Sequence, residues 1–549
     1  MEGDPKKDPS YRLTKEGKVY RRGRKVFANL DVYEGEFLDG MKHGRGQLVL
    51  FNGDIYVGEF ENNFMHGHGT YNYTSYFNEA GEMVVGKRYE GDYEHNKMHG
   101  RGIFQMGFGE VYSGEFEKGM FHGKGNWKLR NGDSFVGMFE RGKPGGKMKA
   151  TWVETGDVYE GTMRMGKKHG HGKITYGQGK GWHEGEWARD KPNGHGVRVY
   201  SNGSKYVGHF SDGEVHGEGM MIYANGDKYV GNFHRGHVSG RGVMKYLRGD
   251  TYDGHFLNGY YFGEGKYTWS DGGYYDGEYK SYKVNKETLI EAPVCNGLRN
   301  GFGLRVFTNG SRYQGQWEDD KLSGHGILTG AGGGVYEGKF FNGFRSGLGR
   351  EQYGNIMGIV FLCPMGFRHK GDGYCVYTGE FRRDHWHGEG EYKCCNGRTF
   401  KGNFRWGKKH GYGLQMYLSD GEAGGYGAIY RFMKYEGDWY EDEKYGHGKL
   451  TYVNGDTLTG PFVHGQPHGL VEFRINKTAR VRFAEYVRGT RIKWVKKSKN
   501  TAKAIASLKE VFKDSEHSVA MKGESLSPST GDKAMSQSSS AGALVLRNP

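Results

Sequence analysis

The sequence predicts an all-β fold in which antiparallel β-hairpins repeat along the chain, and three observations lead to this prediction. A Tyr-x-Gly-x-aromatic core recurs at a nearly fixed interval. Around each core, residues alternate with the period of two that is typical of strands. Glycine-containing turn sequences separate the alternating stretches. A fixed period between about 20 and 50 residues indicates stacked repeats rather than separate compact domains.

The repeat is clearest in YEGEFLDGMKHGRGQLVLFNGD at residues 33–54, and seventeen units carry this core or a close variant. Most steps between units are 23 residues, two are 24 and four are longer. The first glycines of the units are Gly35, Gly58, Gly91, Gly114, Gly137, Gly161, Gly185, Gly208, Gly231, Gly254, Gly277, Gly315, Gly338, Gly379, Gly402, Gly437 and Gly460.

Each unit is predicted to be one β-hairpin. Tyr33, Gly35 and Phe37 should lie on one face of the first strand because successive side chains of a strand point to opposite faces. Gly44 and Gly46 continue the alternation in a second strand after a short turn. We expect the same structural role for the corresponding residues of other units, Tyr56, Gly58, Phe60, Tyr89, Gly91, Tyr112, Gly114, Tyr206, Gly208, Tyr229, Gly231, Tyr252, Gly254, Tyr313, Gly315 and Trp317.

The turn between units is predicted from Asn-Gly-Asp at residues 52–54, which recurs at residues 131–133, 225–227 and 454–456. Asn-Gly favours a tight turn with positive φ at both central residues. Such turns should join consecutive hairpins into one meander.

Glycine is unfavourable inside strands, so its recurrence needs a compensating gain. We expect that gain to be space: without a Cβ at Gly35 or Gly44, the ring of a cross-strand or next-repeat Tyr or Phe can lie flat on the backbone. A ladder of rings would then replace a thick core. One hairpin buries too little apolar surface to fold alone, so neighbouring units must stabilise each other.

The unit closely resembles the MORN repeat (membrane occupation and recognition nexus), whose pattern is Y-x-G-x-[WF]-x-x-G-x-x-H-G-x-G followed by a turn. The resemblance covers about residues 31–470, with departures at Met148, Lys286, Leu458 and Val471. It implies an elongated, twisted antiparallel β rod. Such arrays occur in radial spoke heads of motile cilia, cytoskeletal scaffolds, junctional membrane proteins and beside lipid kinase domains. Because most of this chain is repeats, the resemblance favours the scaffold members.

Four insertions break the period, at residues 72–88, 280–298, 353–374 and 421–434. They are either longer surface loops or docking sites for a partner. Apolar residues of the third insertion are the candidates for docking: Ile359, Val360, Phe361 and Leu362.

The ends of the chain should differ from the array. Residues 1–30 are predicted to be an extension with capping strands, and residues 471–489 to add terminal strands with charged edges. Residues 490–514 are predicted to form a basic segment that includes an amphipathic helix, and residues 515–549 to be a Ser-rich, disordered tail. The candidate binding residues of the basic segment are Lys493, Lys496, Lys497, Lys499, Lys503, Ile505, Leu508 and Phe512.

Three partners are open for this basic segment: a protein or the array itself, an acidic protein surface such as tubulin, and an anionic membrane. The net charge is +14, and the stretch from Arg488 to Asp514 carries nine Lys or Arg against two acids, or +7. The longest apolar run, residues 356–365, is about half of what a spanning helix needs. We expect neither a signal peptide nor a membrane span.

Composition argues against several functions. Hydrophobic residues make up only 35%, whereas aromatics reach 15% and Gly numbers 99, so the chain is neither a large compact enzyme nor disordered. The aromatics follow the repeat period, which indicates packing rather than nucleic-acid binding. Five cysteines without CxxC spacing indicate reduced thiols. We expect no cofactor, no small-molecule substrate and no catalytic residue.

Metal binding is not expected either. A histidine precedes the second glycine pair in many units, but equivalent strands lie about 9.5 Å apart, too far to share one ion. His385 and His387 share a unit with Cys394 and Cys395, yet the extended chain between His387 and Cys394 spans about 23 Å. The histidine row is interpreted as structural.

The sequence therefore predicts a non-enzymatic scaffold that binds other proteins in a ciliary or flagellar axonemal complex, a radial spoke or a similar assembly, in the cytoplasm and cytoskeleton. The alternative is a peripheral membrane–cytoskeleton organiser that binds anionic lipid through the repeats and the basic tail. A regulatory subunit of an enzyme carried by another chain is a third possibility.

Overall fold

The computed structural model describes residues 11–77, 83–84, 86–280, 297–353, 374–395, 397–417, 432–496, 498 and 503. Thirty-nine strands form one antiparallel sheet that does not close, and β7 and β8 form a separate two-stranded sheet. The predicted all-β hairpin array is therefore confirmed. The predicted C-terminal helix and Ser-rich tail lie outside the described residues, apart from Lys503. No helix in the described part is long and apolar enough to cross a membrane.

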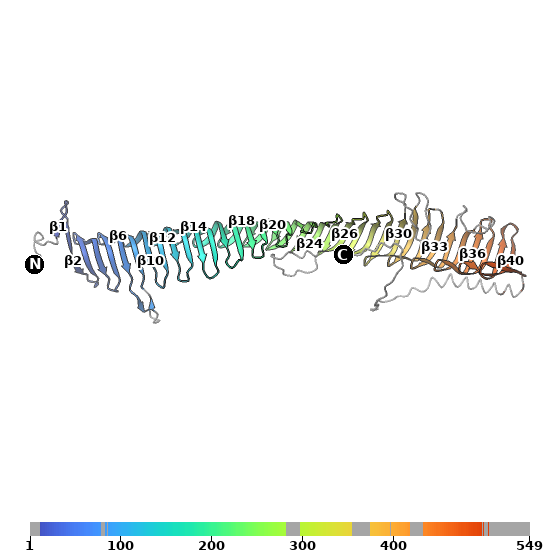
Figure 1. Cartoon of the computed structure of the whole chain (residues 1–549), viewed down its shortest axis with the longest axis horizontal. Coiled ribbons are helices and arrows are strands. Elements are labelled where there is room, and N and C mark those ends of the chain that lie inside the picture. The colour runs from blue at the N-terminus through green and yellow to red at the C-terminus, as the bar shows by residue number, and fades with distance from the viewer. Residues whose placement is uncertain are drawn as a thin grey trace. The chain divides into compact units, whose positions relative to one another are not determined.

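The chain divides into two compact units, and in the described part the first covers residues 11–260. Its strands follow one another in sequence order (Figure 1). They are β1 (Tyr11–Leu13), β2 (Val19–Val26), β3 (Val32–Leu38), β4 (Met41–Val49), β5 (Ile55–Glu61), β6 (Phe64–Asn72), β7 (Tyr76–Phe77), β8 (Met83–Val84), β9 (Arg88–Glu94), β10 (Lys97–Gln105), β11 (Val111–Glu117), β12 (Met120–Lys128), β13 (Ser134–Glu140), β14 (Lys143–Trp152), β15 (Asp157–Arg164), β16 (Lys167–Thr175), β17 (Gly181–Ala188), β18 (Lys191–Tyr200), β19 (Lys205–Ser211), β20 (Glu214–Ile222), β21 (Lys228–His234), β22 (His237–Lys245) and β23 (Thr251–Leu257).

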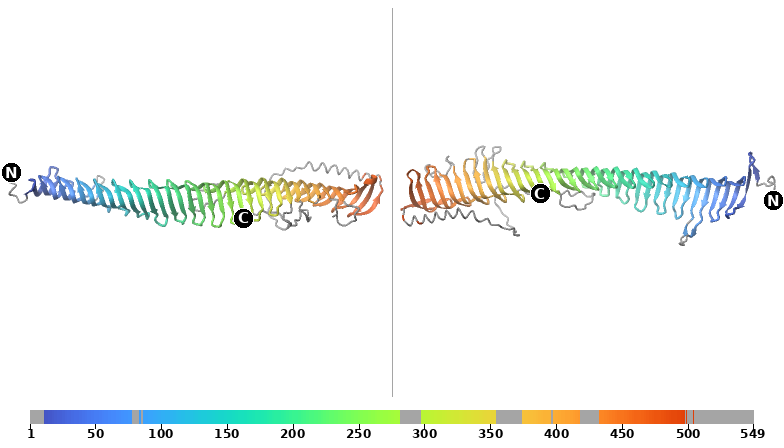
Figure 2. Two further views of the ribbon diagram at one scale, coloured as in Figure 1. Left: turned by 90° about the horizontal axis from the view of Figure 1, so that it is seen from above. Right: turned by 180° about the vertical axis from the view of Figure 1, so that it is seen from behind.

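Figure 2 shows from two further sides that consecutive strands within each unit lie side by side. The second unit begins at Tyr261 and is built in the same way as the first. Its elements are β24 (Tyr260–Thr268), which starts at the boundary, β25 (Tyr274–Lys280), β26 (Leu298–Val306), β27 (Arg312–Glu318), β28 (Lys321–Thr329), β29 (Val335–Phe341), β30 (Phe344–Tyr353), β31 (Cys375–Arg382), β32 (His385–Lys393), β33 (Thr399–Arg405), β34 (Lys408–Met416), β35 (Phe432–Tyr440), β36 (Glu443–Tyr452), β37 (Thr457–Val463), β38 (Gln466–Pro467), β39 (Gly469–Ile475), the 3-10 helix η1 (Asn476–Thr478), β40 (Arg480–Val487) and β41 (Thr490–Val495).

The hairpin turn within a unit has two residues of positive φ. Between β3 and β4 these are Asp39 at 51° and Gly40 at 79°. This is the tight turn whose twist matches that of the flanking strands. Opposite Gly35 lies Gly46, and the register then shifts so that Phe37 faces Lys42. This β-bulge, repeated in most hairpins, interrupts the predicted regular alternation.

The prediction for the turn between units was wrong. At residues 52–54 only Gly53 has a positive φ, 86°, and the Leu50 N–H donates to the Asp54 carbonyl at 2.8 Å. This pattern is typical of a longer loop with a type I turn followed by a left-handed glycine. Asn52 has a different task, because its side-chain oxygen accepts the Asp54 N–H at 3.0 Å and holds the loop closed.

Side chains in the turns connect each unit to the next. At one end of the strands, the Asp54 carboxylate accepts the Thr74 N–H of the next repeat at 2.8 Å. At the other end, the Asn63 side-chain oxygen accepts the Lys42 N–H of the preceding hairpin at 2.9 Å. Neighbouring hairpins are therefore joined through their turns at both ends of the strands, as well as along the strands.

The predicted space above glycine exists at Gly35, where an added Cβ would clash with the Tyr33 hydroxyl and with the Gly46 backbone. It also exists at Gly46, where a Cβ would clash with ring atoms of Tyr33. Gly44 instead has φ at 58° and faces the Glu36 carboxylate, so it serves the bulge rather than the ring. The prediction of Gly44 as a ring site was wrong because the bulge shifts its register.

The insertions leave the pairing of their flanking strands intact. Gly69 lies opposite Gly91 across the first insertion. Gly349 lies opposite Gly379 across the third. Strand pairing therefore continues across these two insertions, and residues 354–373 of the third, for which longer loops or docking were predicted, lie outside the described residues.

The C-terminal strands also correct the sequence analysis. Residues 490–495 form strand β41 and pair with β40, whereas the sequence placed them in a basic helical segment. Arg488 and Gly489 have φ of 47° and 81°, which makes the same tight turn as within the repeats. This turn reverses the chain so that residues 490–495 pair with β40. Strand pairing therefore determines the structure of these residues, and their basic pattern does not.

Candidate functional site

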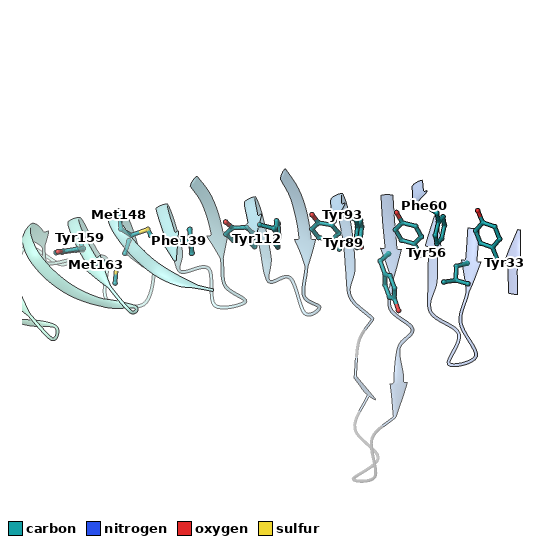
Figure 3. Packing of buried hydrophobic residues seen from close by; sticks show 14 of the residues in the cluster. Tyr33, Tyr56, Phe60, Tyr89, Tyr93, Tyr112, Phe139, Met148, Tyr159 and Met163 are labelled. Atoms are coloured by element: carbon teal, nitrogen blue, oxygen red, sulfur yellow. The ribbon is translucent and has the colours of Figure 1, made fainter. Parts of the chain in front are cut away.

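One face of the sheet carries aromatic rings at regularly repeated positions, here called the ring ladder. Tyr33 meets Phe37 of its own hairpin and Phe60 of the next, both edge-on with ring centroids 4.9 Å apart. Edge-on contact is favoured because the positive edge of one ring faces the negative face of another. The Tyr33 hydroxyl donates to the Glu36 carbonyl at 2.8 Å, so this buried polar group is satisfied. Figure 3 shows the row of rings from Tyr33 to Tyr112.

The predicted repeat residues take their places in this ladder. The eight tyrosines predicted from the sequence have no exposed surface, and Trp317 is 5% exposed. Burial raises the pKa of six of them, so these phenols stay neutral at pH 7: Tyr33, Tyr56, Tyr89, Tyr112, Tyr206 and Tyr313. The tyrosines at 0% exposure include Tyr33, Tyr56, Tyr89, Tyr112, Tyr206, Tyr229, Tyr252 and Tyr313.

Two departures from the repeat change the ladder locally. Met148 stands where glycine was expected, and its buried side chain fills the space beside Phe139 with Met163 (Figure 3). His183 takes the tyrosine position and lies edge-on to Trp187 and Phe210. Burial lowers the pKa of His183 to about 4, so the imidazole is neutral at pH 7.

Lysine or arginine recurs at a second regular position of the repeat. This residue lies opposite the last aromatic residue of the Tyr-x-Gly-x-aromatic core, as Lys42 lies opposite Phe37. Lys42 lies over Tyr33 and Phe60, at 6.0 and 5.7 Å from the ring centroids. Such contacts partly replace the hydration that a buried ammonium loses. Other units have apolar residues here, for example Met65. The cationic residues at this position are Lys42, Lys168, Arg299, Arg345, Lys409 and Lys444.

A pocket of about 320 Å³ lies beside two of these cations in the second unit. Lys409 lies over the Trp439 ring at 4.7 Å and donates to Gln415 at 2.7 Å. Lys444 lies over the Tyr435 ring at 5.5 Å. Burial lowers the pKa of each lysine to about 8. The remaining lining residues are Tyr392, Cys394, Arg398, Tyr417, Asp442, Glu443, His464 and Gly465.

Three cysteines meet at the edge of this pocket. The sulfurs of Cys375, Cys394 and Cys395 all lie within 4.8 Å of one another. Cys375 and Cys394 are buried, and their Sγ atoms are 3.1 Å apart. The histidines considered with them in the sequence lie elsewhere: His385 and His387 both contact the Trp406 ring. The sequence analysis missed Cys375.

Three histidines of the row, His66, His99 and His122, pair with acidic residues at the turns. His66 lies 3.3 Å from the Glu61 carboxylate, and His122 lies 3.3 Å from the Glu117 carboxylate. Each pair belongs to one hairpin and spans its two-residue turn. These contacts support the structural interpretation of the row.

The opposite face of the sheet is mostly polar. Oppositely charged residues face each other across neighbouring strands, as with Lys149 and Glu160 at 2.7 Å. On this face Phe302 of β26, Ile327 of β28 and Leu348 of β30 are 53%, 41% and 67% exposed. This group is called the outer apolar cluster below.

The predicted binding residues are placed only in part. Lys493 lies on β41 and pairs with Glu485 at 3.0 Å. Lys496 and Lys503 are exposed. The other candidates lie outside the described residues: Ile359, Phe361, Lys497, Lys499, Ile505, Leu508 and Phe512.

Similar proteins match only parts of this chain. Alsin of Rattus norvegicus is 32% identical over 189 residues, which is 31% of this chain and 11% of that protein. Alsin of Homo sapiens matches to the same extent. ALS2 C-terminal-like protein of Homo sapiens is 32% identical over 94 residues, 17% of this chain and 9% of that protein. The chain thus spans about a tenth of the length of these relatives.

Among solved structures, the TCP domain of SAS-4 from Drosophila melanogaster, in complex with a proline-rich motif of Ana2, matches with a TM-score of 0.19 and 13% identity. It covers 27% of this chain and 80% of that one. This likeness is too weak to support an argument.

The family model of the MORN repeat matches fifteen segments. Two further hairpins, at Gly137 and Gly460, have the same strand pairing without a match. The matched segments are residues 33–55, 56–76, 89–107, 112–134, 159–180, 183–205, 206–228, 229–251, 252–274, 296–312, 313–335, 336–355, 377–397, 400–417 and 435–457. They cover more than half of the chain, and the protein therefore belongs to the MORN-repeat family.

Proposed function

We propose that the chain is a non-enzymatic scaffold that binds other proteins in a ciliary or flagellar axonemal complex, of the radial spoke type or similar. The observation that carries the proposal is the extent of the array: nearly all described residues belong to repeating hairpins whose rings and tyrosine hydroxyls are engaged in packing. A scaffold needs an extended, rigid surface, which stacked repeats provide.

The outer apolar cluster is the surface on which we place partner binding. Its three side chains lie on alternate strands, and the residues opposite Phe302 and Ile327 include the uncharged Gln316 and Gln314. Exposed apolar groups surrounded by polar residues are typical of protein interfaces. The cluster lacks the concentrated positive charge that binding to an anionic membrane requires.

The test is to express the tagged chain in ciliated cells, locate it and identify what co-purifies with it. We expect an axonemal pool and a defined set of axonemal proteins. The double variant Phe302→Glu and Leu348→Glu should lose partners while keeping its β-sheet circular dichroism. Val57→Glu is the matched control, because Val57 is 48% exposed on the same face of the first unit. A uniformly cytosolic protein with no axonemal partners would contradict the proposal.

A second candidate function, binding to anionic membranes, is favoured by the surface of β40 and β41. Ile492 and Trp494 are 58% and 44% exposed there. Arg482 and Arg491 lie over the Trp494 ring at 5.3 and 4.6 Å. Tryptophan next to basic residues is typical of segments that bind the membrane interface.

Sedimentation with phosphatidylserine vesicles distinguishes this function from the first. Membrane binding predicts co-sedimentation that falls steeply with salt and is lost when the basic residues are neutralised. Those residues are Lys493, Lys496, Lys497, Lys499 and Lys503. The scaffold proposal predicts that the chain stays in the supernatant at physiological salt.

A further inference from the structure

One repeat of the second unit departs from the pattern at two adjoining places. In nine of the seventeen units the residue two before the ladder position is Asp or Ser. In seven of these units its side chain is seen to accept the N–H of the residue twenty positions later. Asp54 does so for Thr74 at 2.8 Å, and Asp227 for Leu247 at 2.9 Å. Before Tyr377 this position holds Cys375, and the residue twenty positions later is Cys395.

The second departure concerns the residue seventeen positions after the ladder tyrosine. It is usually large, as with Tyr73, Tyr176 and Trp269, but after Tyr377 it is Cys394. Val376 pairs with Lys393, so Cys375 and Cys394 face each other as the next step of the same register. Cys375 thus stands where other repeats have Asp or Ser, and Cys394 stands where they have a large side chain. Both changes place a sulfur at the same point of the repeat.

We propose that Cys375, Cys394 and Cys395 form a binding site for one soft d10 metal ion, Zn²⁺ or Cu⁺. Sulfurs bound to one zinc at about 2.3 Å lie about 3.8 Å apart. The three sulfurs already lie within 4.8 Å of one another, so shifts of about 1 Å complete the site. Cys395 is exposed and Cys394 borders the pocket, which gives an ion two routes to the sulfurs.

The chemistry of the sulfurs suits a cation. Thiolates are among the ligands that Zn²⁺ and Cu⁺ prefer in proteins. Each thiol that becomes a ligand releases its proton to solvent and forms one metal–sulfur bond, and no electron is transferred. Cu⁺ needs only three thiolates, whereas Zn²⁺ would take a water as the fourth ligand.

The experiment titrates the reduced, full-length chain with Cd²⁺, Zn²⁺ and Cu⁺ in the absence of chelating buffer. Cd²⁺ reports thiolate binding directly through its ultraviolet charge-transfer absorption, and Zn²⁺ and Cu⁺ are measured by displacement of Cd²⁺ and by metal analysis after gel filtration. We expect one equivalent of bound ion per chain, with protons released on binding.

Variants test whether these cysteines hold the ion. Cys375→Asp restores the residue that other repeats use, so it should keep the fold and lose the bound equivalent. Cys395→Ser should lose it too. Cys295→Ser, whose cysteine lies outside the described residues, is the control and should bind like the parent. Circular dichroism checks folding in each case.

Two results would overturn the proposal. One is a reduced chain that takes up none of the three ions, or takes them up equally well in Cys375→Asp. The other is a Cys375–Cys394 disulfide in chain isolated without reductant, with no metal uptake once the bond has been reduced.

Discussion

Tyrosine and glycine act together at the scale of single residues. The ring of Tyr33 lies where a Cβ on Gly46 would be, and the same arrangement recurs with Tyr229 over Gly242. Sequence analysis predicted that rings lie over glycine, because only packing explains glycine at fixed positions in strands. The prediction was right for Gly35 but named Gly44 in place of Gly46, because a period of two cannot reveal a bulge that shifts the register.

His183 should make the first unit sensitive to acid. Its pKa is about 4 in the folded chain and about 6.5 in the unfolded chain, so between about pH 6.5 and pH 4 the unfolded chain binds the proton more strongly than the folded chain. The free energy of unfolding should therefore fall by about 2 kcal/mol between pH 7 and pH 5 through this residue. The charge of Arg198, across the strand, acts in the same direction.

The measurement compares hydrogen exchange of β17 and β18 in the parent chain and in His183→Tyr at both pH values, after correction for intrinsic exchange rates. The variant restores the usual ladder residue, so it should lose this part of the pH dependence. Equal pH dependence in the two proteins would mean that His183 is not the group responsible.

Turns are the elements that hold neighbouring hairpins together. Their existence was predictable from Asn-Gly, but the conformation was not, because it depends on which side chain reaches the next repeat. The same limit applies to Cys375, which is separated from Cys394 by nineteen positions and meets it only through strand register. The cysteine two residues before Tyr377, where other repeats have Asp or Ser, was the signal in the sequence that could have revealed this site.

Asp227→Ala should destabilise the first unit by about 1–3 kcal/mol, because the Leu247 N–H loses its hydrogen bond to the buried Asp227 carboxylate. Asp227→Ser should cost clearly less, since Ser204 does the same task for Ala224 at 3.0 Å in the preceding repeat. Denaturant unfolding followed by fluorescence gives both values. If the two variants lose the same stability, the hydrogen bond is not the cause.

Lys444 should behave as a nucleophilic amine near neutral pH. Its pKa of about 8 leaves a larger neutral fraction than an ordinary lysine has, and the adjoining pocket admits a small reagent. Labelling with an amine-reactive reagent, followed site by site by mass spectrometry, should show a midpoint near pH 8 for Lys444. Exposed Lys205 provides the comparison, and an identical midpoint for both would contradict the prediction.

Within each unit of the whole molecule, the ladder continues past the insertions. Tyr56 meets Tyr93 at 5.1 Å although the first insertion separates them in sequence. In the second unit Tyr336 meets Phe381 at 4.8 Å in the same way. The period alone predicted interruptions, whereas the rings show that packing does not depend on uniform spacing in sequence.

The central claim is that rings in glycine spaces hold successive hairpins together, and exchange rates of backbone amides in Gly46→Ala test it most directly. A Cβ there displaces Tyr33, so amides of β3 to β5 should exchange at least about tenfold faster, for a local loss of about 1.4 kcal/mol or more. Gly23→Ala is the matched control, because a Cβ on Gly23 meets nothing within 4 Å. The account predicts parent-like exchange for Gly23→Ala and fast exchange for Gly46→Ala, and equal rates in the two variants would contradict it.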